Sequence, residues 1–352
     1  MKFSQQIIFW YRENARDLPW RKTKEPYNIW LSEIMLQQTR VAQGLPYYKK
    51  FIKNFPTVFE LAQAKEDKVL KLWQGLGYYS RARNLHFTAK QIAENGGRFP
   101  DNYLDLKKLK GVGDYTASAI ASFCYGEPVA VVDGNVYRVL SRYFGIDIPI
   151  NSTEGIKIFK QKAEGQLDKA QPAIYNQAIM EFGARQCTPK NPDCQVCPLV
   201  KDCKAFQLDK ITELPVKLKK TKVLEKHFNF LIFKNQHEEV LLEKREQKGI
   251  WRNLFQFPLY ESEQQIFHES DIKEYMRQQN PKLLVKSIEL QHEKPIKHVL
   301  SHRKLWVNFW KIEVDDFKGF SQKFIPVKYK RVNDFAVPIV IHKFLETYNF
   351  YS

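Results

Sequence analysis

The stretch CTPKNPDCQVCPLVKDC, residues 187–203, carries four of the five cysteines in a chain of 352 residues. The spacing C-x6-C-x2-C-x5-C lets four thiolates on one short loop converge on a metal centre. A cubane 4Fe-4S cluster fits this spacing best, because four thiolates hold it. Structural zinc sites usually join two short cysteine pairs across a longer insert, and disulfide frameworks are typical of small secreted domains. The loop therefore predicts a 4Fe-4S cluster on Cys187, Cys194, Cys197 and Cys203, with zinc and then disulfides as the alternatives.

The composition indicates a polyanionic partner. Lys and Arg number 56 against 39 Asp and Glu, which gives a formal net charge of +17. This balance favours nucleic acid as the partner, and an anionic membrane is the second candidate. A proteome that is basic in general would also explain the charge. No apolar run approaches the roughly 20 residues of a membrane span, and Ile7–Tyr11 is too short for a signal-peptide core. We expect a bacterial-type cytoplasmic protein, associated with the nucleoid, that has reduced thiols and no membrane partner.

The chain divides into two parts with different patterns of apolar residues. Residues 1–208 are expected to be mostly helical and to end in the cysteine loop. Gly, Pro or Asn in the connections is typical of helix ends. The expected helices are Tyr27–Gln43, Val58–Trp73, Arg81–Glu94, Tyr115–Tyr125, Asn135–Phe144, Thr153–Leu167 and Ala173–Gly183.

A basic linker, residues 209–225, precedes a second domain, residues 226–352. The Pro-containing run Leu214–Lys222 is typical of a linker. Alternating apolar and aromatic residues beyond it predict a smaller α+β domain. Its expected strands are His227–Phe233, Glu239–Lys244, Leu283–Leu290 and Lys304–Val314, and its expected helices are Ile272–Gln278 and Val337–Tyr348.

A glycine-containing turn, Leu109–Ala117, connects two of the expected helices. Gly111 and Gly113 are expected to frame a turn too tight for side chains, which leaves N–H groups for a DNA phosphate. An ordinary helix–helix turn explains them equally well. Asp133 lies one helix after this turn in the sequence, and its simplest role is that of a helix N-cap. Its position can also bring it to the DNA-facing side of the turn.

Hairpin, helix, aspartate and cysteine loop in this order resemble the helix-hairpin-helix DNA glycosylases of the endonuclease III superfamily. In that family the cysteine loop holds a 4Fe-4S cluster. The chain is most similar to the MutY-type adenine DNA glycosylase branch. The matching blocks are LSEIMLQQTR at 31–40, GLGYYSRARN at 75–84, VDGNV at 132–136 and LSH at 300–302.

The resemblance implies removal of adenine mispaired with 8-oxoguanine or guanine in double-stranded DNA, after the base is flipped out. Cleavage of the glycosidic bond needs an acid for the base and a counter-charge for the sugar. Glu33 is the implied acid, since an apolar surround raises a carboxyl pKa. Asp133 would stabilise or capture the sugar cation, while Asn135 orients the pair and Tyr115 hydrogen-bonds to Asp133 or the sugar. Without the resemblance, the simplest interpretation of Glu33 is an exposed glutamate on a helix.

Tyr115 also bears on strand cleavage. Bifunctional relatives place a nucleophilic lysine at this hairpin position, and a tyrosine cannot form the Schiff base. We therefore expect a monofunctional glycosylase that leaves an abasic site. A bifunctional pyrimidine-lesion glycosylase and a non-catalytic or nucleotide-hydrolysing protein are the alternative functions.

Other positions follow from the resemblance, and each has an alternative in helix packing or a solvated surface. The implied adenine pocket is Trp20, Arg21, Leu36 and Gln177, and the residues implied to insert into the base stack are Gln38 and Tyr78. Implied phosphate contacts are Arg81, Arg83, Lys190, Lys201 and Lys204.

The second domain is expected to resemble a Nudix fold and to recognise 8-oxoguanine through Ser301 and His302. Leu300 stands where the family has an aromatic residue, so the resemblance implies hydrogen bonding to the damaged base but not stacking on it. A polar turn between strands is the alternative for this segment. Residues Leu254–Gln279 lack the REx2EE spacing that holds magnesium in Nudix hydrolases, so we expect no nucleotide hydrolysis. We expect a monomer.

Overall fold

The computed structural model describes residues 2–218 and 223–347, and its contacts group the chain into two units. The first comprises Met1–Gln63 and Asn84–Lys219, and the second Ala64–Arg83 and Lys220–Ser352. Part of the expected linker and the end of the expected last helix lie outside the described residues. Within the described part, no helix is both long and apolar enough to cross a membrane.

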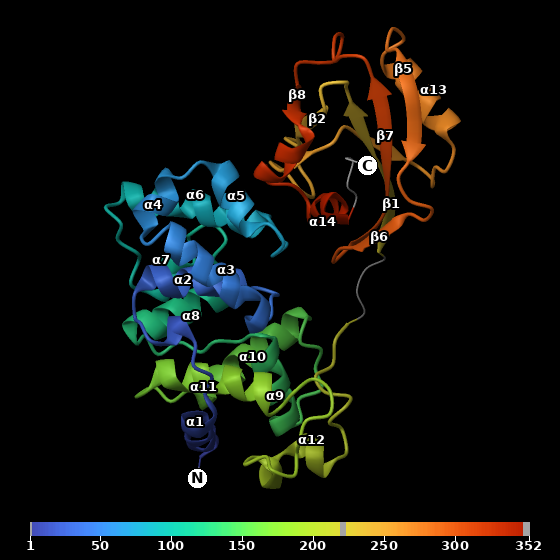
Figure 1. Ribbon diagram of the computed structural model, residues 1–352. Helices are drawn as coiled ribbons and strands as arrows, with labels where there is room; N and C mark the ends of the chain where they lie inside the picture. Colours follow the sequence, from blue (N-terminus) through green and yellow to red (C-terminus); the bar gives the residue numbers. More distant parts are fainter. Residues whose placement is uncertain (1, 219–222, 348–352) are drawn as a thin grey trace. The chain divides into compact units, whose positions relative to one another are not determined.

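The first unit is helical (Figure 1). Its helices are α1 Phe3–Asn14, η1 Pro19–Arg21, α2 Pro26–Leu36, α3 Val41–Asn54, α4 Val58–Gln63, α7 Tyr103–Leu106, α8 Asp114–Tyr125, α9 Gly134–Phe144, α10 Thr153–Gln166, α11 Pro172–Arg185, η2 Val200–Asp202 and α12 Lys204–Gln207. Helix α6, Ser80–Glu94, begins in the second unit and continues into the first.

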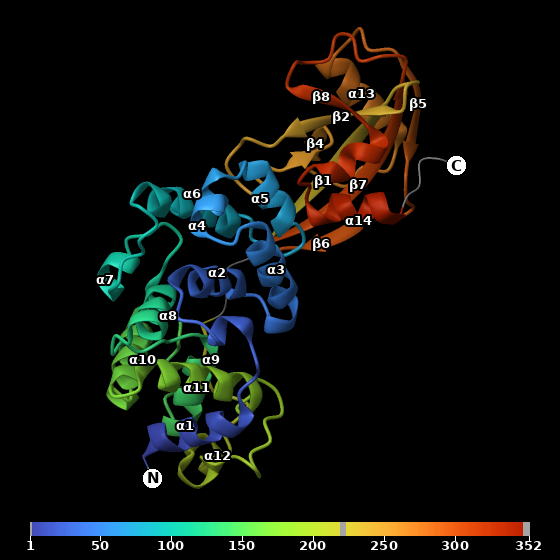
Figure 2. The ribbon, with the colours of Figure 1, turned by 60° about the vertical axis from the view of Figure 1, so that its left-hand side comes forward.

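Helix α2 lies in the core of the first unit. Every residue from Ile29 to Met35 is buried, so the helix is enclosed on all sides rather than amphipathic. It packs against α3 and α8, while α11 packs against α1, α8 and α9. Figures 1 and 2 both show α1 beside α11. A side chain in the middle of α2 therefore meets an apolar environment unless a cleft reaches it.

Two expected helices of the first part are wrong in extent. The expected helix Tyr27–Gln43 ends at Leu36, and α3 begins at Val41 after a turn in which Gln38 has a φ of 55°. The expected helix Val58–Trp73 is interrupted between α4 and α5, Glu66–Trp73. Neither turn contains Gly or Pro, so the apolar pattern runs through both without a signal. Helices α1 and α3 were missed.

The second unit joins α5 to a mixed sheet, which among residues 223–347 has eight strands. Its main path is β3-β2-β1-β7-β5, and β4 pairs with β1, β6 with β7 and β8 with β2. The strands are β1 Leu224–Lys234, β2 Glu239–Lys244, β3 Phe255–Gln256, β4 Leu259–Ser262, β5 Val285–Leu290, β6 Ile296–Val299, β7 Arg303–Val314 and β8 Phe324–Lys328. The helices after β4 are α13 Glu269–Gln279, η3 Tyr329–Asp334 and α14 Ile339–Thr347.

Strands β1 and β7 form a parallel pair in the middle of this sheet, with Phe230 opposite Phe309. Successive side chains of a strand point to opposite faces. Phe309 stacks on Phe344 of α14 at 3.8 Å, whereas the next residue, Trp310, packs in one cluster with Ile272 of α13. The two helices therefore cover opposite faces of the sheet, as Figure 2 shows. The expected fold class, a mostly helical part followed by an α+β domain, is confirmed.

Candidate active site

A cleft of about 1120 Å³ opens among the helices of the first unit. It gathers most of the site residues that the sequence predicted. Those that line it are Trp20, Arg21, Glu33, Leu36, Gln38, Gly113, Tyr115, Asp133, Asn135 and Gln177. The lining does not include Gly111, Tyr78, Ser301, His302, Cys187, Cys194, Cys197 or Cys203.

Glu33 projects from the buried helix α2 into the cleft and is only 5% exposed. Its Oε2 has no hydrogen-bond partner. Burial raises the pKa of this carboxyl to about 7, an effect that the hydrogen bond from Tyr115 opposes and the charge of Asp133 reinforces. Glu33 is therefore partly protonated at neutral pH, and the alternative of an exposed helix glutamate is excluded.

Asp133 is the N-cap of α9 and also faces the cleft. Its Oδ1 accepts hydrogen bonds from the backbone N–H groups of Asn135 at 2.9 Å and Val136 at 2.8 Å. Its Oδ2 accepts from Asn135 Nδ2 at 2.8 Å. Burial raises the pKa of Asp133, and these donors together with the charge of Arg138 oppose the rise. Asp133 thus accepts three hydrogen bonds that favour its ionised form, whereas Glu33 has one carboxyl oxygen without a partner.

Tyr115 comes from the first turn of α8 and lies beside both acids. Its hydroxyl contacts Met180 Sδ at 3.2 Å. Burial raises the pKa of Tyr115 well above its ordinary value, and the charges of Glu33 and Asp133 raise it further. The phenol therefore stays neutral and can donate a hydrogen bond to either carboxylate.

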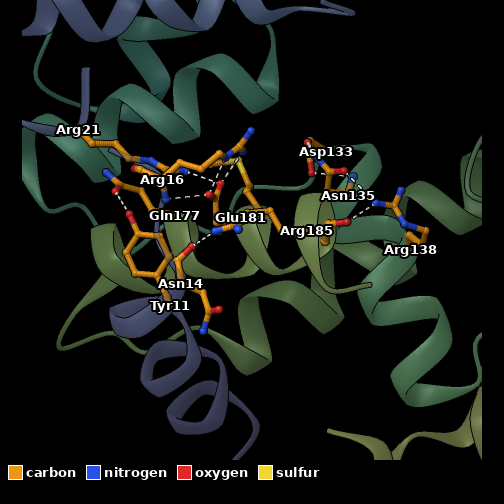
Figure 3. Close-up of polar contacts among 12 residues, drawn as sticks. Tyr11, Asn14, Arg16, Arg21, Asp133, Asn135, Arg138, Gln177, Glu181 and Arg185 are labelled. Atoms are coloured by element: carbon orange, nitrogen blue, oxygen red, sulfur yellow. Dashed lines mark hydrogen bonds and ion pairs between the residues drawn. The ribbon is translucent and has the colours of Figure 1, made fainter. Parts of the chain in front are cut away.

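A second cluster in the cleft surrounds Glu181 of α11, which is 1% exposed (Figure 3). Its Oε1 accepts from the backbone N–H of Arg16 and from Arg16 Nε, and its Oε2 accepts from Arg16 Nη2 at 2.6 Å and Arg21 Nη2 at 2.8 Å. Burial raises the pKa of Glu181, but the bonds from the two arginines outweigh it and hold the pKa at about 2. All four acceptor positions of the carboxylate are used, so Glu181 anchors two guanidinium groups.

Gln177 lies one turn before Glu181 on the same face of α11, and its Oε1 accepts a bond from Tyr11 Oη at 2.7 Å. Figure 3 shows this pair beside the arginine cluster. Sequence reasoning found Arg21 and Gln177 but missed Arg16 and Glu181. The spacing of four between Gln177 and Glu181 is a signal that could have placed Glu181 in the cleft.

Two arginines of α9 fasten the start of the cysteine loop. Arg138 Nη2 donates to Asn135 Oδ1 at 2.9 Å, and its Nε donates to the carbonyl of Cys187 at 2.7 Å. Figure 3 shows Asp133, Asn135 and Arg138 in one group. One turn later, Arg142 Nη1 donates to Cys187 Sγ at 3.5 Å and to the carbonyl of Thr188 at 2.7 Å. The loop is thus tied to the helix that Asp133 caps.

The four loop cysteines are half-buried, and none of them forms a disulfide in this structure. Burial raises the pKa of Cys197 to about 12, and the charges of the other three loop thiols add to the rise, which shows that the four thiols lie near one another. A set of four thiolates fits iron–sulfur clusters or zinc. In the described ranges, no three His, Cys, Asp or Glu side chains are arranged to hold a single metal ion.

Gln38 and Tyr78 share an unusual backbone. Both are exposed, and their φ angles are 55° and 49°. Non-glycine residues seldom adopt this left-handed region, and such strain concentrates at functional sites. Gln38 lies in the turn after α2 and lines the cleft. Tyr78 belongs to the second unit, where its hydroxyl forms a 2.6 Å hydrogen bond with Ser301 Oγ.

The two hairpin glycines differ, which corrects one expectation. Gly111 has a φ of 84°, and a Cβ there would lie 2.9 Å from Asn84 Cβ. Gly113 is the N-cap of α8 with a φ of −94°, and a Cβ there would meet nothing within 4 Å. Only Gly111 is required by the turn itself. Gly113 leaves open space at the start of α8, beside the ion pair between Lys107 and Asp114.

Arg81 does not present its charge to solvent. It is 8% exposed, its Nη2 donates to the carbonyl of Gly77, and its guanidinium lies over the rings of Trp73 and Tyr78. Arg83 Nη1 donates to the carbonyl of Arg252. The expected phosphate contact of Arg81 is therefore wrong, because its side chain is used to hold the loop that precedes it.

Two family models match separate parts of the chain. The model of the HhH-GPD superfamily base excision DNA repair proteins matches residues 31–161, and the NUDIX domain model matches residues 229–347. The adenine DNA glycosylase of Buchnera aphidicola subsp. Schizaphis graminum is 38% identical and covers 98% of each chain. The human adenine DNA glycosylase is 43% identical over 58% of this chain and 39% of its own.

Solved structures agree on the helical part. A thermostable thymine-DNA glycosylase is 30% identical with a TM-score of 0.55 over 58% of this chain and 95% of that chain. A non-covalent endonuclease III–DNA complex, 21% identical with a TM-score of 0.50 over 59% of this chain and 99% of that chain, shows the same fold. The class of protein is thus an HhH-GPD base excision repair enzyme followed by a Nudix domain.

Within this class, the chain belongs to the adenine DNA glycosylase family, since relatives 38% identical match it along nearly its whole length. The family and the kind of enzyme predicted from the sequence are confirmed.

Proposed function

We propose that this enzyme removes adenine from mispairs with 8-oxoguanine or guanine in double-stranded DNA and leaves an abasic site. The observation that carries the proposal is the pair of carboxyl groups on one cleft. Burial raises the pKa of Glu33 to about 7, while Asp133 accepts three hydrogen bonds as an anion. Of two acids in one cleft, the one with fewer donors can serve as proton donor and the one held by more donors as counter-charge.

The proposed reaction begins when Glu33 donates its proton to N7 of the flipped adenine. The bond between N9 and C1′ then breaks, and the electron pair leaves with the base. Positive charge develops on the sugar, opposite the Asp133 carboxylate. Glu33, now ionised, removes a proton from the water that attacks C1′. Asn135 holds Asp133 in place, and the neutral phenol of Tyr115 donates a hydrogen bond within this group.

The adenine pocket is proposed to be Trp20, Arg21, Leu36 and Gln177, which share the cleft with both acids. The Glu181 carboxylate supports it, because it fixes the Arg21 guanidinium at 2.8 Å. An adenine has a planar edge with one donor and several acceptors. A fixed guanidinium and an amide can form hydrogen bonds with such an edge. A pocket filled with water would not distinguish adenine from other bases.

A 4Fe-4S cluster is proposed on Cys187, Cys194, Cys197 and Cys203. The donor set and the mutual proximity of the thiols support it. When bound, the cluster fixes the fold of the loop, and the excision chemistry needs no electron transfer from it. Arg142 then donates a hydrogen bond toward a ligating sulfur.

Contacts with DNA are proposed at both strained residues and at the hairpin. Gln38 and Tyr78 would insert into the base stack, and the N–H groups after Gly111 and Gly113 would bind a phosphate. Ser301 and His302 would recognise 8-oxoguanine. We further propose a monomer with a catalytic domain at 1–208, a linker at 209–225 and a recognition domain at 226–352.

The proposal is tested with a duplex that carries adenine opposite 8-oxoguanine. The wild type should release adenine, and the strand should break only after alkali treatment. Glu33→Gln and Asp133→Asn should each lower the single-turnover rate by at least about 10²-fold. Glu154→Gln, an exposed glutamate of α10, is the control and should keep the rate. Retention of activity by either cleft variant would refute the role assigned to that residue.

A further inference from the structure

Residues 64–83 come early in the chain, yet their contacts group them with the second unit. We propose that this segment is a docking element of the second domain, and that Gln74 and Lys71 are positioning residues that hold Tyr78 against Ser301. The inference deepens the proposed function and rests on it, because Tyr78 and Ser301 are proposed to meet the mispair there. Its consequence is that discrimination of the base opposite adenine depends on α5.

The first contact region lies at the end of α5. Gln74 Oε1 accepts from the backbone N–H of Val337 at 3.1 Å and from Lys71 Nζ at 3.2 Å. Lys71 Nζ also donates to the carbonyl of Phe335 at 3.1 Å. Val337 is fully buried, so its N–H has no access to water as a substitute partner. The Gln74 side chain thus accepts the hydrogen bond that a backbone carbonyl of a neighbouring strand would otherwise accept from Val337, just before α14.

The second contact region lies at the two ends of the segment. Glu66 Oε1 accepts from Asn253 Nδ2 at 2.6 Å, and Asp67 Oδ1 pairs with Lys244 Nζ at 2.6 Å. The latter pair is partly exposed and contributes little to stability. At the other end, Arg83 Nη1 donates to the carbonyl of Arg252 at 2.9 Å. The segment is therefore held at its start, middle and end.

The loop between these regions is stiff, so docking is transmitted to Tyr78. Trp73 Nε1 donates to the carbonyl of Gly77 at 3.0 Å, and Arg81 lies over both the Trp73 and Tyr78 rings. Tyr78 itself keeps a φ of 49°. A residue in this conformation is retained only where its surroundings determine it. The surroundings here are the Arg81 guanidinium and the hydrogen bond to Ser301.

The experiment compares adenine excision from two duplexes, one with 8-oxoguanine and one with guanine opposite adenine, under single-turnover conditions. Gln74→Met removes the acceptor with little change of size, and we expect the rate ratio between the duplexes to fall about fivefold, as for one lost buried hydrogen bond. Lys71→Met should act in the same direction. Gln74→Glu keeps the acceptor and should keep the ratio. Lys65→Met removes an exposed charge just before α5 and is the matched control.

A second measurement does not depend on activity. Hydrogen exchange at the Val337 amide should become faster in Gln74→Met and stay slow in Gln74→Glu and Lys65→Met, with thermal unfolding measured on each variant. An unchanged ratio with unchanged exchange in Gln74→Met would overturn the proposal. An equal loss of rate on both duplexes would overturn the role in discrimination. A wild type that releases adenine without any preference would instead refute the proposed recognition of 8-oxoguanine, and the exchange result would still decide whether the segment docks.

Discussion

Two buried glutamates of the same cleft have pKa values shifted in opposite directions. Glu33 on α2 and Glu181 on α11 are 5% and 1% exposed, so burial alone would raise the pKa of both. The pKa of Glu33 is raised to about 7, whereas that of Glu181 is lowered to about 2. The difference lies in the partners, because Glu181 meets two guanidinium groups and Glu33 has one unpartnered oxygen. Burial makes a carboxyl sensitive to its partners, and the partners decide its charge.

The largest effect should follow from Glu181→Leu. The change leaves the Arg16 and Arg21 guanidinium groups without their carboxylate at a partly buried site. We expect the free energy of unfolding to fall by about 3–5 kcal/mol, as for one partner removed from a buried ion pair. Urea unfolding followed by circular dichroism measures it. The exposed pair Lys22–Asp17 provides the control, since Asp17→Leu should change stability by less than about 1 kcal/mol.

Glu33→Gln should instead raise the free energy of unfolding at high pH. The folded pKa of Glu33 lies above its unfolded value, so its contribution to stability is fully present below about pH 4.5 and is lost as the pH rises through about 7. An amide has no such loss. We expect the variant to gain about 3 kcal/mol over the wild type at pH 8 relative to pH 4.5. Equal pH dependence of urea unfolding in both proteins would mean that Glu33 is not the raised acid.

The rate of adenine excision should reveal the same titration. Only protonated Glu33 can act as the acid, so the single-turnover rate should fall about tenfold per pH unit above about 7. The rate should also fall at low pH as Asp133 takes up a proton, since burial raises the pKa of Asp133. A pH series on one duplex measures this. A rate that instead rises through pH 7 would contradict the assignment of Glu33 as proton donor.

The smallest effect should come from Tyr115→Phe. The hydrogen bond from Tyr115 lowers the pKa of Glu33, so its loss should move the midpoint of the pH–rate profile to higher pH. The absolute rate is also expected to fall by less than about 10²-fold, since one neutral donor is removed. Fitting the midpoint separates the two effects. A midpoint that moves to lower pH would show that Tyr115 does not stabilise the ionised form.

The sequence located the two acids better than it located their surroundings. Glu33 and Asp133 lie in blocks of specific sequence, and both face the cleft. The Glu181 cluster could not be predicted from a local sequence block, because Arg21 and Arg16 are 160 and 165 residues away from Glu181 along the chain. The turn at Gln38 was missed for a local reason, since it contains neither Gly nor Pro. The contacts of residues 64–83 with the rest of the second unit are equally non-local, and no periodicity in α5 indicates them.

The parallel pairing of β1 with β7 has a consequence for the time course of folding. The two strands are in register from Leu224 opposite Arg303 to Lys234 opposite Glu313, so the sheet closes across a long intervening segment. Pairings of high sequence separation form slowly, because the chain between them must first be ordered. We expect β1 to stay an open edge until β7 has been synthesised. Residues 64–83 are synthesised much earlier, but their contacts with Phe335 and Val337 can form only after the end of the chain has been synthesised.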